Sequence, residues 1–158
     1  MRRMTFSLTA TLLLVASALA LHAGAAGTTI ASAGGSGAFS SASALLGVDL
    51  RASTFGGGVS FNADGTVDGS LEELLTGADS ITGLPATILV EATITGGTAN
   101  ADGSVTVSGT ATVTTASQTL TGVPVTALMT TSGITLTVGT TTLSPQTLTD
   151  GAIYIGPQ

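Results

Sequence analysis

The chain has 158 residues, of which 43% are hydrophobic and 8% are charged, and it contains no cysteine. This length suits one domain with its own core, and the lack of cysteine excludes disulfide bonds. Three basic residues oppose nine acidic ones. Nucleic acids and anionic membranes are therefore poor partners, because proteins bind both through clusters of Lys and Arg.

The first 25 residues are typical of a secretory signal peptide. Arg2 and Arg3 form the basic start, residues 6–21 are apolar, and Ala18–Ala20 or Ala23–Ala25 offers small residues for cleavage. An uncleaved membrane anchor is the alternative, but polar residues interrupt the stretch, which falls short of the ~20 apolar residues of a membrane span. We favour general secretion with cleavage after Ala25, and therefore expect a mature chain that is secreted or held at the cell surface.

Removing this peptide changes the chemistry of the chain. Arg51 then stands alone against nine carboxylates, a formal charge of 1 − 9 = −8, and His22, the single histidine, is lost. Residues 26–36 are small and polar and predict a flexible leader rich in Gly, Ser and Ala. The single β domain is expected over residues 37–158.

Apolar and polar residues alternate along most of that domain. Val105, Val107, Ala111 and Val113 share one face of residues 105–114, as in a half-buried strand. The other expected strands are 48–52, 58–61, 66–71, 86–95, 118–129, 134–138 and 152–155. Pro124 places 118–129 at an edge or a bulge, because proline has no backbone donor.

The segment Leu71–Leu75 is the one helix candidate, a single turn that Gly77 would end. Its two carboxylates, Glu72 and Glu73, are interpreted as a solvated strand end and not as a catalytic acid pair.

Two turns have the same residues, Asn62–Gly65 and Asn100–Gly103, and both suit hairpins in which glycine takes the left-handed conformation. Calcium binding is the functional alternative. The spacing speaks against it, because an EF-type loop counted with Gly65 in sixth place has Ser60 first and Leu71 twelfth, where carboxylates are needed. We assign no metal site.

Several segments together resemble the post-COAP family of secreted bacterial β domains. The resemblance rests on Gly35–Phe39, Val59–Gly69, Gly109–Val113 and Leu148–Ile155, and the order of elements is similar over the whole domain. Residues 125–139 depart from the family pattern, which has aspartates and glycines of a loop there. The resemblance implies an all-β fold and export from a bacterial cell, and it implies no mechanism.

Most catalytic chemistries lack their residues. Ser-His-acid catalysis needs an imidazole, and the mature chain has none; Cys nucleophiles, Lys Schiff bases and zinc sites lack their side chains as well. Glycoside hydrolysis by two carboxylates stays open, with Asp49, Glu91 or the Glu72 and Glu73 pair as candidates. Sugar sites usually also offer aromatic platforms, which are scarce here.

Threonine pairs of the form Thr-x-Thr recur at Thr93, Thr110, Thr112, Thr119, Thr135, Thr140 and Thr147. Such pairs are familiar from ice-binding faces. Their spacing is irregular, whereas an ordered flat array needs a fixed repeat, so ice binding is a minor alternative.

Hairpin signals at intervals of about 8 to 12 residues predict an antiparallel meander of about eight strands that forms a small barrel, with a β-sandwich as the alternative. The leading function is a non-catalytic extracellular domain with a structural or surface-interaction role. The second is a lipocalin-like carrier of a small apolar ligand, and an enzyme is less expected. An interior cavity would favour the carrier, whereas a filled interior with an exposed apolar patch would favour interaction. No catalytic or cofactor-binding residue is assigned, and no cofactor is expected.

Overall fold

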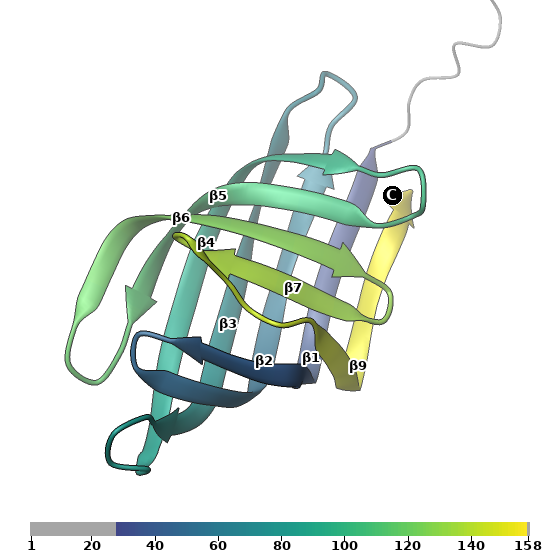
Figure 1. The fold of residues 1–158 in the computed structure, drawn as a ribbon. Helices are drawn as coiled ribbons and strands as arrows, with labels where there is room; N and C mark the ends of the chain where they lie inside the picture. The colour runs from purple at the N-terminus through teal and green to yellow at the C-terminus, as the bar shows by residue number, and fades with distance from the viewer. Residues whose placement is uncertain (1–27, 158) are drawn as a thin grey trace, which may run out of the picture.

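The computed structural model describes residues 28–157, and their regular structure consists of β-strands (Figure 1). The strands are β1 (Thr29–Leu45), β2 (Val48–Phe61), β3 (Val67–Asp79), β4 (Pro85–Ala99), β5 (Val105–Thr114), β6 (Thr119–Thr130), β7 (Gly133–Val138), β8 (Thr141–Thr142) and β9 (Gln146–Pro157). The expected signal peptide, residues 1–25, lies outside the described residues. In the described part of the chain, no helix is long and apolar enough to cross a membrane.

All neighbouring strands are antiparallel and form one sheet. β9 returns to pair with β1 along its whole length and also pairs with β7, so the sheet closes into a ring of eight strands, with β8 as a short addition to β7. The expected antiparallel all-β meander is therefore confirmed as one closed, barrel-like ring.

The core lies inside this ring, because alternate residues of each strand point inward. The inward set expected from β5 is confirmed: Val105, Val107, Ala111 and Val113 are all buried. The matching sets of β4 (Ile88, Val90, Ala92, Ile94) and β7 (Ile134, Leu136, Val138) are buried as well. Aliphatic side chains from opposite walls form one hydrophobic cluster, so the interior is filled.

The flexible leader expected over residues 26–36 is wrong for residues 29–36, and the domain begins at Thr29 instead of residue 37. These residues belong to β1 and pair with β2 on one side and with β9 on the other. Their small size has a structural reason, because a Cβ at Gly35 would overlap the carbonyl oxygen of Asp150. Small residues here allow close strand contact and are not a sign of flexibility.

The helical turn expected at Leu71–Leu75 is also wrong, because these residues lie in β3. Leu71, Leu74 and Leu75 have helical spacing, but Leu71, Glu73 and Leu75 point into the ring while Glu72 and Leu74 are exposed, which is the period of a strand. The segments 48–52 and 58–61 form one strand, β2. Pro124 pairs in regular register with Thr110 of β5, and the register shift between β6 and β5 lies before it, between Leu120 and Val123. Residues 119–124 lack partners on β7, so the edge position expected for this proline is confirmed and a bulge at Pro124 itself is not.

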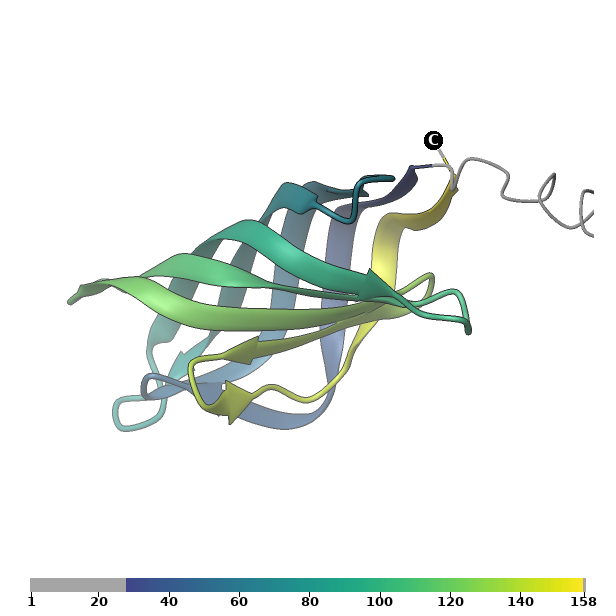
Figure 2. The ribbon, with the colours of Figure 1, turned by 90° about the horizontal axis from the view of Figure 1, so that it is seen from above.

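The ring has two different ends (Figures 1 and 2). The turns β1–β2, β3–β4, β5–β6 and β7–β8 gather at one of them, which we call the turn end. The β1–β2 and β3–β4 turns are in direct contact there, because Ser80 N donates a hydrogen bond of 2.9 Å to Gly47 O. The start of β1 and the end of β9 lie at the opposite end, beside the β2–β3 turn.

Candidate functional site

One carboxyl group lies inside the apolar ring. Glu73 of β3 is fully buried, between Phe55 of β2 and Val90 of β4 in the strand register. A buried carboxyl needs partners, because taking a charged or polar group out of water costs free energy unless hydrogen bonds replace the water.

The hydrogen-bond partner of the Glu73 carboxyl lies 73 residues later in the chain. The side-chain amide of Gln146, at the start of β9, donates a hydrogen bond of 2.6 Å to Glu73 Oε1. The hydroxyl of Ser53 in β2 in turn donates to Gln146 Oε1. Glu73 Oε2 has no hydrogen-bond partner among residues 28–157. Three strands therefore contribute to a short polar chain within the core.

Burial raises the pKa of Glu73 from 4.5 to about 7, because the surrounding apolar side chains disfavour the charged form. The Gln146 amide and the Ser53 hydroxyl oppose this rise. Glu73 therefore changes charge near neutral pH, unlike an ordinary carboxyl. The interpretation of Glu73 as part of a solvated strand end is wrong.

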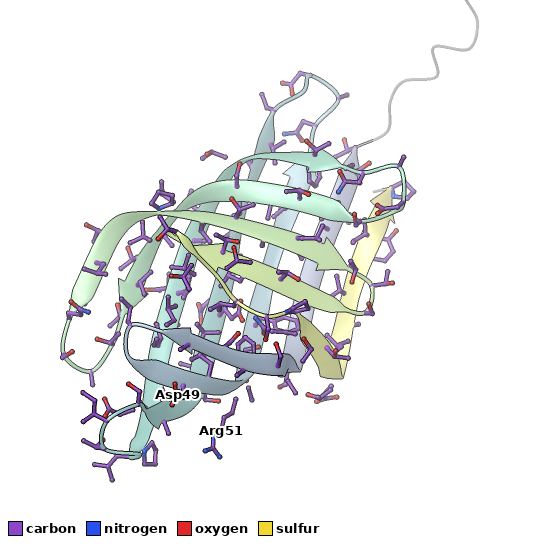
Figure 3. All side chains as sticks on the ribbon, in the orientation of Figure 1. Asp49 and Arg51 are labelled. Atoms are coloured by element: carbon purple, nitrogen blue, oxygen red, sulfur yellow. The ribbon has the colours of Figure 1, made fainter. Side chains whose placement is uncertain are left out.

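The other candidate carboxylates do not join Glu73. Glu72 is its neighbour in sequence but points to the outer face, so the two cannot act as an acid pair. Asp49 is exposed on β2, two residues from Arg51, whose side chain extends away from the ring (Figure 3).

Glu72 and Glu91 do lie opposite each other across β3 and β4. Both are exposed, and they border a shallow surface hollow whose other lining residues are Ser70, Leu71, Ala92, Thr93 and Thr112. The lining contains no aromatic side chain, which sugar sites usually provide. This hollow does not resemble a glycosidase site.

Both hairpin turns form as expected, and each Asp carboxylate is used locally. Asp64 Oδ1 accepts bonds from the backbone N (2.9 Å) and hydroxyl (2.6 Å) of Thr66, and Asp102 Oδ1 accepts the same pair from Ser104. These bonds lower the pKa of both carboxyls. Within residues 28–157, no group of three or more His, Cys, Asp or Glu is placed to hold a metal ion.

The threonines expected for an ice-binding face do not form a long row on β4 and β5. Thr93 and Thr110 lie opposite each other, but the row continues to Ser70 on one side and to Pro124 on the other. Thr112 lies opposite Glu91. The outer face therefore mixes threonine with charged residues and proline.

An apolar hollow opens at the turn end. Its volume is about 230 Å³, and its apolar lining consists of Leu45, Leu46, Val113, Leu120, Val123 and Val138. The β3–β4 turn, which contacts the β1–β2 turn through Ser80 and Gly47, adds two exposed apolar side chains at the same end of the ring, Ile81 (92% exposed) and Leu84 (65% exposed). We call this hollow together with Ile81 and Leu84 the apolar turn surface.

Leu46 stands out within this surface. Its backbone has a φ of +47°, and the next residue, Gly47, has a φ of +79°. Two-residue hairpin turns with positive φ at both positions favour Asn-Gly, because in this conformation a Cβ lies too close to the following carbonyl oxygen and asparagine can compensate with local hydrogen bonds, whereas leucine cannot. The chain therefore holds a half-exposed leucine at a position where its backbone is unfavourable, a feature that points to a role outside folding.

The sequence did not indicate this surface, because the turns that form it are far apart in the chain. One local feature could have indicated it: in the pair Leu46-Gly47, leucine stands before the glycine of a turn, where a polar residue is usual. Comparison with family models, curated proteins and solved structures found no match.

Proposed function

We propose that this chain is an exported, non-catalytic β domain that binds a protein partner through its apolar turn surface. The observation that carries the proposal is an apolar hollow lined by the exposed Leu46 and Leu120, with the exposed Ile81 and Leu84 on the β3–β4 turn at the same end of the ring. Exposed apolar surface of this kind marks interaction sites in soluble proteins.

The filled interior supports interaction over carriage. The side chains inside the ring pack into one cluster, so the hollow at the turn end lies outside the core. Its volume of about 230 Å³ lies below the usual range of ligand pockets, about 300–1,000 Å³. It suits one aliphatic or aromatic side chain of a partner better than a whole lipid-like ligand.

The charge of this domain indicates which charged residues a partner would carry. Residues 28–157 contain nine carboxylates and one basic side chain, Arg51. A partner whose apolar anchor is flanked by Lys or Arg is therefore favoured over an acidic one, since opposite potentials steer association. Resemblance to the post-COAP domains, which are secreted, agrees with a role outside the cell.

The test uses β6, which has two leucines of equal exposure. Leu120 (37% exposed) lines the hollow, and Leu128 (40% exposed) lies elsewhere on the outer surface. Binding of the neutral dye Nile red, and of synthetic peptides with one Leu or Phe between lysines, is measured for the wild type, Leu120→Thr and Leu128→Thr. We expect Leu120→Thr to weaken both by about tenfold and Leu128→Thr to leave them unchanged, because losing one apolar anchor costs about 1–3 kcal/mol.

Equal effects of the two substitutions would contradict the proposal. Native mass spectrometry of the secreted protein adds a second test, since a small apolar molecule that co-purifies with it would favour the carrier instead.

A further inference from the structure

The ring closes at a narrow seam. β1 pairs with β9 along the whole of β9, and β6 pairs with β7 from Val125 to Thr130. In contrast, β7 and β9 pair only at Gly133 with Thr147 and at Ile134 with Gln146. We call these two residue pairs the seam. Because it has the fewest paired residues in the ring, it is the first place where the ring is expected to open.

The buried polar chain ends at this seam. Gln146 is paired with Ile134 across the seam, and its side chain donates to Glu73 on β3 and accepts from Ser53 on β2. The position of β9 at the seam therefore depends on a side chain that faces the interior carboxyl. Gly37 of β1 lies beside this arrangement, since a Cβ there would be 3.4 Å from both Gln146 and Phe55.

No other ionisable group of the described residues faces Glu73. β1, β5, β6, β7 and β8 contain no ionisable side chain. On the remaining strands, Asp49 and Arg51 of β2, Glu72 of β3, Glu91 of β4 and Asp150 and Tyr154 of β9 are exposed, while Asp68 and Asp79 lie at the two ends of β3. A charge on Glu73 would therefore have no opposite charge to stabilise it.

We propose that Glu73 makes the closure of the ring sensitive to pH: its uncharged form suits the apolar interior, whereas its ionised form is disfavoured there and is stabilised when water reaches it by opening between β7 and β9. The proposal is independent of the partner bound at the turn end.

The direction follows from the pKa of Glu73, which is raised to about 7 in the folded chain from 4.5. The folded chain holds this proton where the unfolded chain has lost it, so stability is greatest below about pH 4.5 and falls until about pH 7. The difference of 7 − 4.5 = 2.5 units corresponds to a roughly 300-fold drop in the folding equilibrium constant. Above about pH 7 the loss is complete and the curve is level.

The first test follows urea unfolding of the purified protein from about pH 5.5 to about pH 8, a range in which ordinary carboxyls are already ionised. The wild type, Glu73→Gln and Glu72→Gln are compared. Glu73→Gln keeps the shape and the neutral state of the side chain, whereas Glu72→Gln removes a charge from the outer face of the same strand. We expect the midpoint to fall with pH in the wild type and in Glu72→Gln, and to stay level in Glu73→Gln.

The second test needs no variant. Hydrogen exchange of backbone amides, corrected for the intrinsic effect of pH, is measured in the wild type on both sides of pH 7. Amides of 133–135 and 146–148 should lose protection at the higher pH by at least tenfold more than amides of 71–75. A midpoint that does not change with pH in the wild type, or an equal loss of protection in the two sets, would overturn the proposal.

Discussion

Gln146 Nε2 donates a hydrogen bond of 2.6 Å to Glu73 Oε1 inside the ring, although the two residues lie 73 positions apart in the chain. Both side chains are almost completely buried. Each side chain therefore replaces hydrogen bonds to water that the other lost on folding. Removing either one leaves the other buried without this partner, which is expected to destabilise the protein.

A double-mutant cycle tests this dependence. We expect Gln146→Leu to destabilise the protein by about 1.5–3 kcal/mol near pH 8, because it removes a hydrogen bond to a charged buried group. The Glu73→Leu/Gln146→Leu variant should be more stable than Gln146→Leu alone, since no carboxyl is left without a donor. Urea unfolding measures all four proteins, and additive effects of the two substitutions would show that the pair does not interact.

At the turn end, we expect Leu46→Asn to stabilise the fold and to weaken binding. Asparagine accepts the positive φ of this position, where leucine costs about 1–2 kcal/mol, and it removes an apolar side chain from the hollow. Thermal unfolding and Nile red binding are the measurements. If Leu46→Asn binds the dye as well as the wild type does, the strained backbone at Leu46 has no connection with recognition.

We expect hydrogen bonds in the β4–β5 turn to stabilise the folded protein at neutral pH and to be lost in acid. Its Asp102 carboxylate accepts two hydrogen bonds from Ser104, which lower the pKa of Asp102 below 3.8. The stabilisation is therefore present above about pH 3.8 and is lost as the pH falls through the lower pKa of the folded chain. Asp102→Ala should lower the melting temperature at pH 6, and the difference from the wild type should shrink as the pH falls below 3.8, because protonation of Asp102 weakens these bonds. Asp150→Ala, a change of an exposed carboxyl outside the turns, is the control.

The sequence predicted the parts of the fold that depend on local pattern. Alternation placed Val105, Val107, Ala111 and Val113 on the inner face, and Asn62–Gly65 and Asn100–Gly103 formed the expected hairpins. The sequence pattern wrongly predicted a solvated Glu73 and a flexible leader that includes residues 29–36. In both places the structure is decided by contacts between residues that are distant in the chain. The burial of a glutamate depends on its hydrogen bond with Gln146, and Gly35 of β1 is needed because β9 lies close beside it.

The same reasoning gives a prediction for the seam. Gly133 pairs with Thr147, and a Cβ at Gly133 would overlap the carbonyl oxygen of Gln146. We therefore expect Gly133→Ala to push β9 away from β7 and to destabilise the protein by about 1–3 kcal/mol, as overpacking does.

The matched control is Gly34→Ala in β1, where a Cβ meets no atom within 4 Å, so its effect should stay within about 0.5 kcal/mol. Because Gly133→Ala already weakens the seam, amides 146–148 should be less protected from exchange at pH 5.5 than in the wild type, while amides 71–75 keep most of their protection. If Gly133→Ala and Gly34→Ala have the same effect, then closure at the seam does not depend on the close approach of these two backbones.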